Sequence, residues 1–139
     1  MAALLSGIIL AILTGLLGSG FDMDRDRAFY PVITIVVASY YVLFAAMAAG
    51  HNTLVIESLV GAAFLSLAVT GFRSTLWIVV AALFAHGVFD MFHGQVIANP
   101  GVPDWWPGFC MAYDVTLSGF LAYRLTAANI VFMKPGKPV

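Results

Sequence analysis

Charged side chains are scarce in this chain. Only 9% of its 139 residues are Asp, Glu, Lys or Arg, whereas 62% are hydrophobic and the mean hydropathy is +0.98. A soluble domain of this length cannot bury so many apolar side chains, but a bilayer removes the need to bury them. The composition therefore predicts an integral membrane protein whose first partner is the lipid bilayer.

Basic clusters and cysteine pairs are also missing. The formal net charge is −1, and no run of Lys and Arg is present to neutralise phosphates, which excludes nucleic acid as a partner. Cys110 is the only cysteine, so no intramolecular disulfide can form. The stretch from Met1 to Gly20 lacks the basic start of a secretory signal, and we interpret it as a first membrane helix.

Five apolar segments approach the roughly 20 residues that a membrane-spanning helix needs. They cover about residues 2–19, 30–49, 53–70, 75–93 and 108–127. Residues 94–107 contain three prolines and should form a surface loop. We therefore predict an all-α, single-domain transmembrane bundle over residues 1–139. In its first helix a stripe of small residues would let a neighbouring helix approach closely: Gly7, Ala11, Gly15 and Gly18.

The basic residues predict the orientation of this bundle. If five helices alternate in direction, every Lys and Arg lies on one side of the membrane: Arg25, Arg27, Arg73, Arg124, Lys134 and Lys137. The positive-inside rule makes that side cytoplasmic. The prediction is an N-out, C-in topology.

Three carboxylates fall within or at the edge of the predicted spans, namely Glu57, Asp90 and Asp114. A charge at bilayer depth costs at least about 2.5 to 3.5 kcal/mol, so such residues normally face the bundle interior and find partners there. In the predicted topology, all three lie in the outer half of the bundle. Three different helices therefore place a carboxylate at a similar depth in the membrane.

Histidines extend this polar group. His86, Asp90 and His93 have the spacing i, i+4 and i+7, which places them on one helical face. A second polar stripe at i, i+4 and i+8 is formed by Cys110, Asp114 and Ser118. If the two faces meet, imidazole and carboxylate groups surround one point, and such mixed donors suit zinc, manganese or iron. Ligands from facing helices are typical of metal sites in bundles.

We interpret this group as a candidate site for a divalent metal and for catalysis. The candidate metal ligands are His86, Asp90, His93 and Asp114. The candidate catalytic groups are Glu57, Asp90 and Asp114, with Glu57 as a general base or a further ligand. The substrate would be a lipid or another hydrophobic small molecule that enters from the outer leaflet.

Other interpretations of the same residues stay open. His86 and Asp90 can form a structural hydrogen-bonded pair, or a proton or substrate relay without a metal. Glu57 can pair with His51 or with a lipid headgroup. For the whole protein, the alternatives are a proton- or cation-coupled transporter protomer and an accessory subunit of a larger membrane complex. A homodimer is compatible with the sequence, although no specific motif indicates one.

One combination of motifs resembles a known family. The run from His86 to His93 is followed by Asn99-Pro100, by Trp105-Trp106-Pro107 and by the run from Cys110 to Asp114. This pattern, His-x-x-x-Asp-x-x-His with Cys-x-x-x-Asp, is similar to that of an uncharacterised family of small bacterial multi-helix membrane proteins. The resemblance implies that these side chains and Glu57 belong together, and it implies a multi-pass protein of the bacterial inner (cytoplasmic) membrane.

Overall fold

The computed structural model describes residues 1–127 and contains five long helices in that range. Each helix begins and ends within three residues of a predicted segment. Their bounds are α1 (Ala2–Gly20), α2 (Phe29–Ala48), α3 (His51–Arg73), α4 (Trp77–Val96) and α5 (Trp106–Thr126), with a short 3-10 turn η1 (Met23–Arg25) between α1 and α2.

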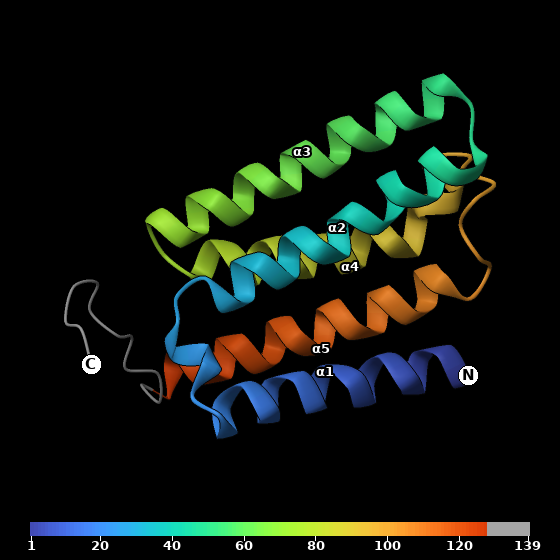
Figure 1. The fold of residues 1–139 in the computed structure, drawn as a ribbon. Helices are drawn as coiled ribbons and strands as arrows, with labels where there is room; N and C mark the ends of the chain where they lie inside the picture. The colour runs from blue at the N-terminus through green and yellow to red at the C-terminus, as the bar shows by residue number, and fades with distance from the viewer. Residues whose placement is uncertain (128–139) are drawn as a thin grey trace.

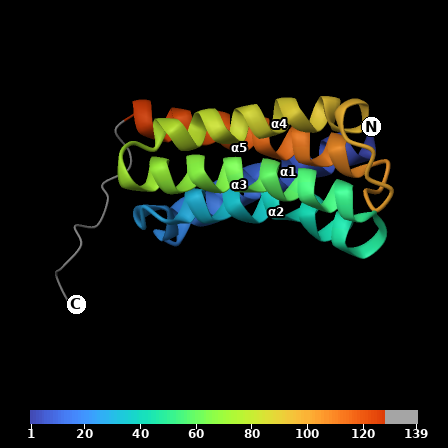
Figure 2. The same cartoon turned by 90° about the horizontal axis from the view of Figure 1, so that it is seen from above.

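The five helices run side by side with similar axes, as Figure 1 and Figure 2 show from two directions. Helix α5 packs between α1 and α4, and α3 packs against both α2 and α4. Helix α1 makes its extensive contacts with α5 and η1, so it lies at the edge of the bundle. This arrangement brings α4 and α5, which carry most of the candidate site, together along their length.

Four of these helices, α1 to α4, are long and apolar enough to cross a membrane. Many of their large apolar side chains point outward, including Leu13, Leu16, Leu59 and Phe84. The fifth helix, α5, is as long as the others but contains Asp114, several hydroxyl residues and Arg124. Because α1 and α4 flank it, α5 can carry more polar side chains than a helix surrounded by lipid.

The loop between α4 and α5 is shorter than the predicted range 94–107. Helix α4 continues to Val96, and α5 already begins at Trp106. The earlier start has a simple cause, since Pro107 occupies the first turn of α5, where a missing N–H costs nothing. The true linker therefore consists of residues 97–105.

The predicted stripe of small residues is buried, as expected for a close helix contact. Gly7, Ala11, Gly15 and Gly18 are the buried residues of α1. A Cβ atom on Gly7 would collide with the carbonyl oxygen of Phe109, and one on Gly15 would lie 2.7 Å from the ring of Phe120. The two helices can approach this closely only because these side chains are absent.

We expect Gly7→Ala to destabilise the protein by about 1–3 kcal/mol, because the added methyl would push α1 away from the backbone of α5. The measurement is thermal unfolding of the purified protein in detergent. Gly20→Ala is the matched control, since no atom lies within 4 Å of a Cβ placed there. Equal stability of the two variants would contradict the close packing of α1 on α5.

The end of the bundle where α1, α3 and α5 terminate carries the described basic residues, which are Arg25, Arg27, Arg73 and Arg124. Lys134 and Lys137 lie outside the described residues. Arg124 donates to the buried carboxylate of Asp24 at 2.8 Å. Arg27 donates to the carbonyl oxygens of Phe72 and Ser74, each at 2.6 Å, where α3 ends. These contacts join the linkers of this end to the helices.

Candidate metal centre

The core of the site is a triad of buried side chains from α4 and α5. His86 and Asp90 lie one turn apart on α4, and Asp114 faces them from α5. The Nδ1 atom of His86 is 2.7 Å from Oδ2 of Asp114 and 3.4 Å from Oδ2 of Asp90. One potential ligand atom from each residue lies within 4.8 Å of the other two. All three side chains are at most 1% exposed, so water does not solvate them.

A close helix contact makes this geometry possible. Gly87 follows His86 on the face of α4 that meets α5, and a Cβ there would lie 2.9 Å from a methyl of Val115 and 3.2 Å from the carbonyl oxygen of Met111. On the other side of the imidazole, the ring of Phe64 packs edge-on at 4.7 Å between centroids. The His86 ring is therefore fixed between an apolar wall from α3 and the carboxylate of α5.

The carboxylates of this triad are poorly satisfied by the protein alone. Within the described part of the chain, Oδ1 of Asp114 and Oδ1 of Asp90 make no hydrogen bond of good geometry, and Oδ2 of Asp90 makes only the 3.4 Å ion-pair contact with Nδ1 of His86. The hydroxyl of Tyr41 lies close enough to Asp90 to interact with its carboxylate. A buried carboxylate without partners is costly, and one imidazolium can neutralise only one of the two acids. When both acids are ionised, the triad therefore carries a net negative charge, and the two Oδ1 atoms offer free lone pairs.

Glu57 and His93 form a separate polar pair, which we call the outer pair because it lies nearer than the triad to the loop between α4 and α5. His93 Nε2 lies 2.8 Å from Oε1 of Glu57, and Asn99 donates its side-chain N–H to the same oxygen at 2.9 Å. His93 lies seven residues from His86 on α4, or roughly 10 Å along the helix axis. The structure therefore brings His86, Asp90 and Asp114 together but places His93 and Glu57 in their own pair.

Tyr41 of α2 lies between the two groups. Its ring stacks on that of His93 with centroids 3.9 Å apart, and its centroid is 6.1 Å from that of His86. Asn99 also donates to the backbone carbonyl of Tyr41 at 3.1 Å. One aromatic side chain thus separates the triad from the outer pair.

A cavity of about 460 Å³ lies beneath the loop between α4 and α5. His93 and Asn99 contribute to its wall, together with loop residues from Ile97 to Asp104. The loop is held against α2 because Gly101 lies directly on the carbonyl oxygen of Phe44, where a Cβ would collide. His93 of the outer pair therefore borders this cavity, whereas no residue of the triad does.

The remaining predicted residues have other surroundings. Glu57 pairs with His93 and not with His51, which is exposed at the start of α3. Cys110 is buried and free, but it is not among the ligand groups that converge on His86. The hydroxyl of Ser118 donates to the carbonyl oxygen of Val115 within its own helix. The second polar stripe thus contributes Asp114 alone to the triad.

Two residues that contact the site had no clear signal of such a role in the sequence. Tyr41 is one of several tyrosines in an apolar helix, where a belt or packing role is as natural. Asn99 lies in the loop, and its bonds to Glu57 and Tyr41 depend on how that loop folds back over the bundle. Neither residue is separated from a candidate ligand by the three, four or seven positions that would place both on one helix face.

Comparison with known proteins adds no relative to this picture: no family model, curated protein or solved structure matches the chain. What the triad can do follows from its donor atoms. One imidazole nitrogen and two carboxylates, buried and close together, can hold a divalent metal ion.

Proposed function

We propose that the chain is a five-span membrane protein whose triad of His86, Asp90 and Asp114 binds one divalent metal ion. The metal site would act on a lipid or another hydrophobic small molecule. The observation that carries this proposal is the pair of buried Oδ1 atoms of Asp90 and Asp114 that make no hydrogen bond, beside an imidazole nitrogen that the two acids share. A bound dication would satisfy these oxygens and remove the excess negative charge.

The charges at the two ends of the bundle support an N-out, C-in orientation. The described arginines are near the end where α1, α3 and α5 terminate, and the linkers of the opposite end, residues 49–50 and 97–105, contain no Lys or Arg. By the positive-inside rule the arginine end is cytoplasmic. In a bacterial cell, this topology would place the cavity beneath the 97–105 loop on the outer face of the inner membrane.

The donor set favours zinc, manganese or iron over calcium or magnesium. A nitrogen ligand from histidine is typical of the transition metals, while calcium and magnesium sites use oxygen donors. In such a site, His86 binds through a deprotonated Nδ1, and Asp90 and Asp114 supply charge. A metal held there would act as a Lewis acid or lower the pKa of a bound water.

A transporter is the less favoured function because apolar layers of α4 and α5 separate the triad from the Asp24–Arg124 pair at the other end of the bundle. Toward the cytoplasmic end, the next layers of α4 and α5 are fully buried and apolar: Leu83, Val79, Leu117 and Leu121. A proton or cation relay needs polar groups on both sides of its central site. The arrangement is that of a site reached from one side.

Elemental analysis of the purified protein tests the metal proposal. We expect about one zinc, manganese or iron ion per chain, and a loss of that metal in His86→Ala and Asp114→Asn. His51→Ala is the matched control, because His51 is exposed and distant from the triad in sequence and contacts. A protein without stoichiometric metal, whose two triad variants behave like wild type, would refute the proposal.

A further inference from the structure

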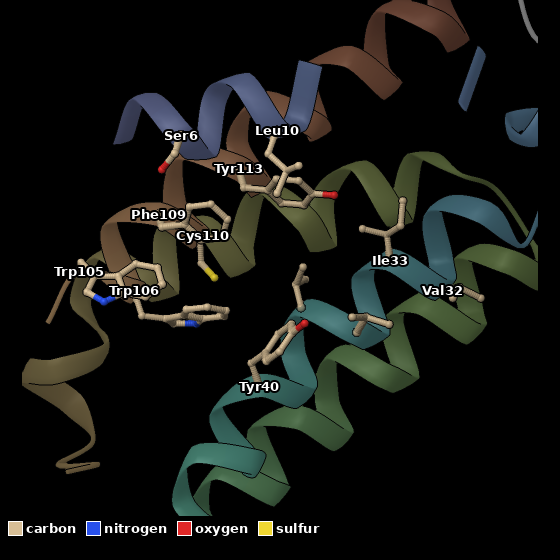
Figure 3. Close-up of a pocket in the computed structure, with 12 residues that line it drawn as sticks. Ser6, Leu10, Val32, Ile33, Tyr40, Trp105, Trp106, Phe109, Cys110 and Tyr113 are labelled. Carbon is tan, nitrogen blue, oxygen red and sulfur yellow. The ribbon is translucent and has the colours of Figure 1, made fainter. Parts of the chain in front are cut away.

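A groove runs between α2 on one side and α1 and α5 on the other. It has a volume of about 410 Å³, and Figure 3 shows its lining side chains, nearly all of them apolar or aromatic. The groove exists because α1 packs on α5 and α2 packs on α3 and α4, which leaves the space between the two groups unfilled.

The groove extends from the surface of the bundle to its interior. Its rim includes Val32 and Val36 of α2 and Leu10 of α1, which are 52%, 46% and 46% exposed. Its floor includes Val37 and Cys110, which are buried. In the proposed topology this rim faces the hydrocarbon of the bilayer, so a lipid chain can enter sideways without crossing water.

One polar group in the lining lacks a partner. The indole Nε1 of Trp106 is buried and has no hydrogen-bond acceptor among the described residues. Figure 3 shows Trp106 and Tyr40 at the outer end of the groove, where their ring centroids are 4.9 Å apart. Trp106 begins α5, at the level where tryptophan N–H groups meet lipid headgroups and ester oxygens. Once the indole turns its N–H toward the groove, an occupant with an acceptor oxygen at this end would satisfy this group.

The groove is too small to enclose a helix. One turn of an α-helix with side chains, about 10 Å wide and 5.4 Å high, fills roughly 400 Å³. A partner helix could therefore place only a few side chains in the groove, whose volume is about 410 Å³. Between Val32 and Tyr40 it extends over eight residues of α2, or roughly 12 Å. These dimensions suit a single hydrocarbon chain.

We propose that this groove binds one acyl chain of a membrane phospholipid, with the ester carbonyl of that chain accepting from the indole N–H of Trp106. The inference rests on the membrane location in the proposed function and not on the metal. It deepens that function by naming the substrate or ligand class. Because Cys110 lines the groove one helical turn before Asp114, the bound chain would lie beside the helix that carries the triad.

Native mass spectrometry of the detergent-solubilised protein tests the groove. Wild type should retain one phospholipid per chain, and Val36→Trp should reduce the lipid-bound fraction about tenfold by filling the groove. Leu43→Trp is the control on the same helix, since Leu43 is 50% exposed but does not line the groove. Retention of lipid by Val36→Trp at the wild-type level would overturn the proposal. A wild-type homodimer that becomes a monomer in Val36→Trp would also overturn it, because a second copy of the chain would then be the occupant.

The role of Trp106 has its own test, which uses two synthetic phospholipids that differ only in ester or ether linkage. Wild type should prefer the ester lipid about threefold to tenfold, the contribution of one hydrogen bond. Trp106→Phe should bind both lipids equally. Equal binding of both lipids by wild type would overturn the assigned contact. Metal content measured on the same samples separates failure of the groove from failure of the metal site.

Discussion

His86→Leu should destabilise the metal-free protein by about 3–5 kcal/mol, because it would leave the carboxylates of Asp90 and Asp114 buried without a cation. In wild type, the imidazole lies 2.7 Å from one acid and 3.4 Å from the other, so it is the shared counter-ion of both. The measurement is unfolding in detergent with a chelator present. His51→Leu, at an exposed position, should leave the stability nearly unchanged.

Replacing the whole triad should have the opposite effect. The variant with His86, Asp90 and Asp114 all changed to Leu removes every buried charge of the cluster, and we expect it to be about 1–4 kcal/mol more stable than metal-free wild type. It should also bind no metal. A triple variant much less stable than wild type would instead show that the triad is a structural link between α4 and α5, and it would remove the main support for a functional site.

This pair of variants separates the interpretations that the sequence leaves open. A structural hydrogen-bonded pair would be retained for stability, so its complete removal should weaken the bundle. A binding site is retained because it binds its ligand, so its removal should abolish ligand binding without lowering the stability of the metal-free protein. The Oδ1 atoms of Asp90 and Asp114, which make no hydrogen bond, favour the second case, since a group selected to join helices would satisfy its own acceptors.

The helices could be predicted because each depends on a local run of apolar residues. The third helix shows how robust this signal is, since α3 extends over His51–Arg73 although it contains Glu57. Helix α5 shows its limit. Composition alone does not reveal that α1 and α4 flank this helix, and that contact is what allows it to hold Asp114.

The sequence predicts which site residues share a face of one helix, but not which residues of different helices meet. The spacing of His86, Asp90 and His93 predicts one face of α4, and the three side chains are all buried. Which partner each one meets depends on the rotation and height of the neighbouring helices. Glu57 on α3 lies at the height of His93, while Asp114 on α5 lies at the height of His86, and no spacing within one helix contains that information.

Metal affinity should distinguish the triad from the outer pair. Asp114→Asn should weaken metal binding by at least about 100-fold, since loss of an outer-sphere partner alone costs 10- to 100-fold. Glu57→Gln changes charge by the same amount on the neighbouring helix, but Glu57 contacts His93 and Asn99 and is not in the group that converges on His86. Its effect on metal affinity should be less than about tenfold.

Competition between the protein and a coloured chelator gives both affinities in the same buffer. If Glu57→Gln weakens binding as strongly as Asp114→Asn, the metal must contact Glu57, and the two groups form one site through a rearrangement of Tyr41. If only Asp114→Asn weakens metal binding, Glu57 and His93 lie on the path from the cavity beneath the α4–α5 loop to the triad. The wall of that cavity includes His93. The second result is expected, because seven residues of α4 separate His93 from His86 by roughly 10 Å.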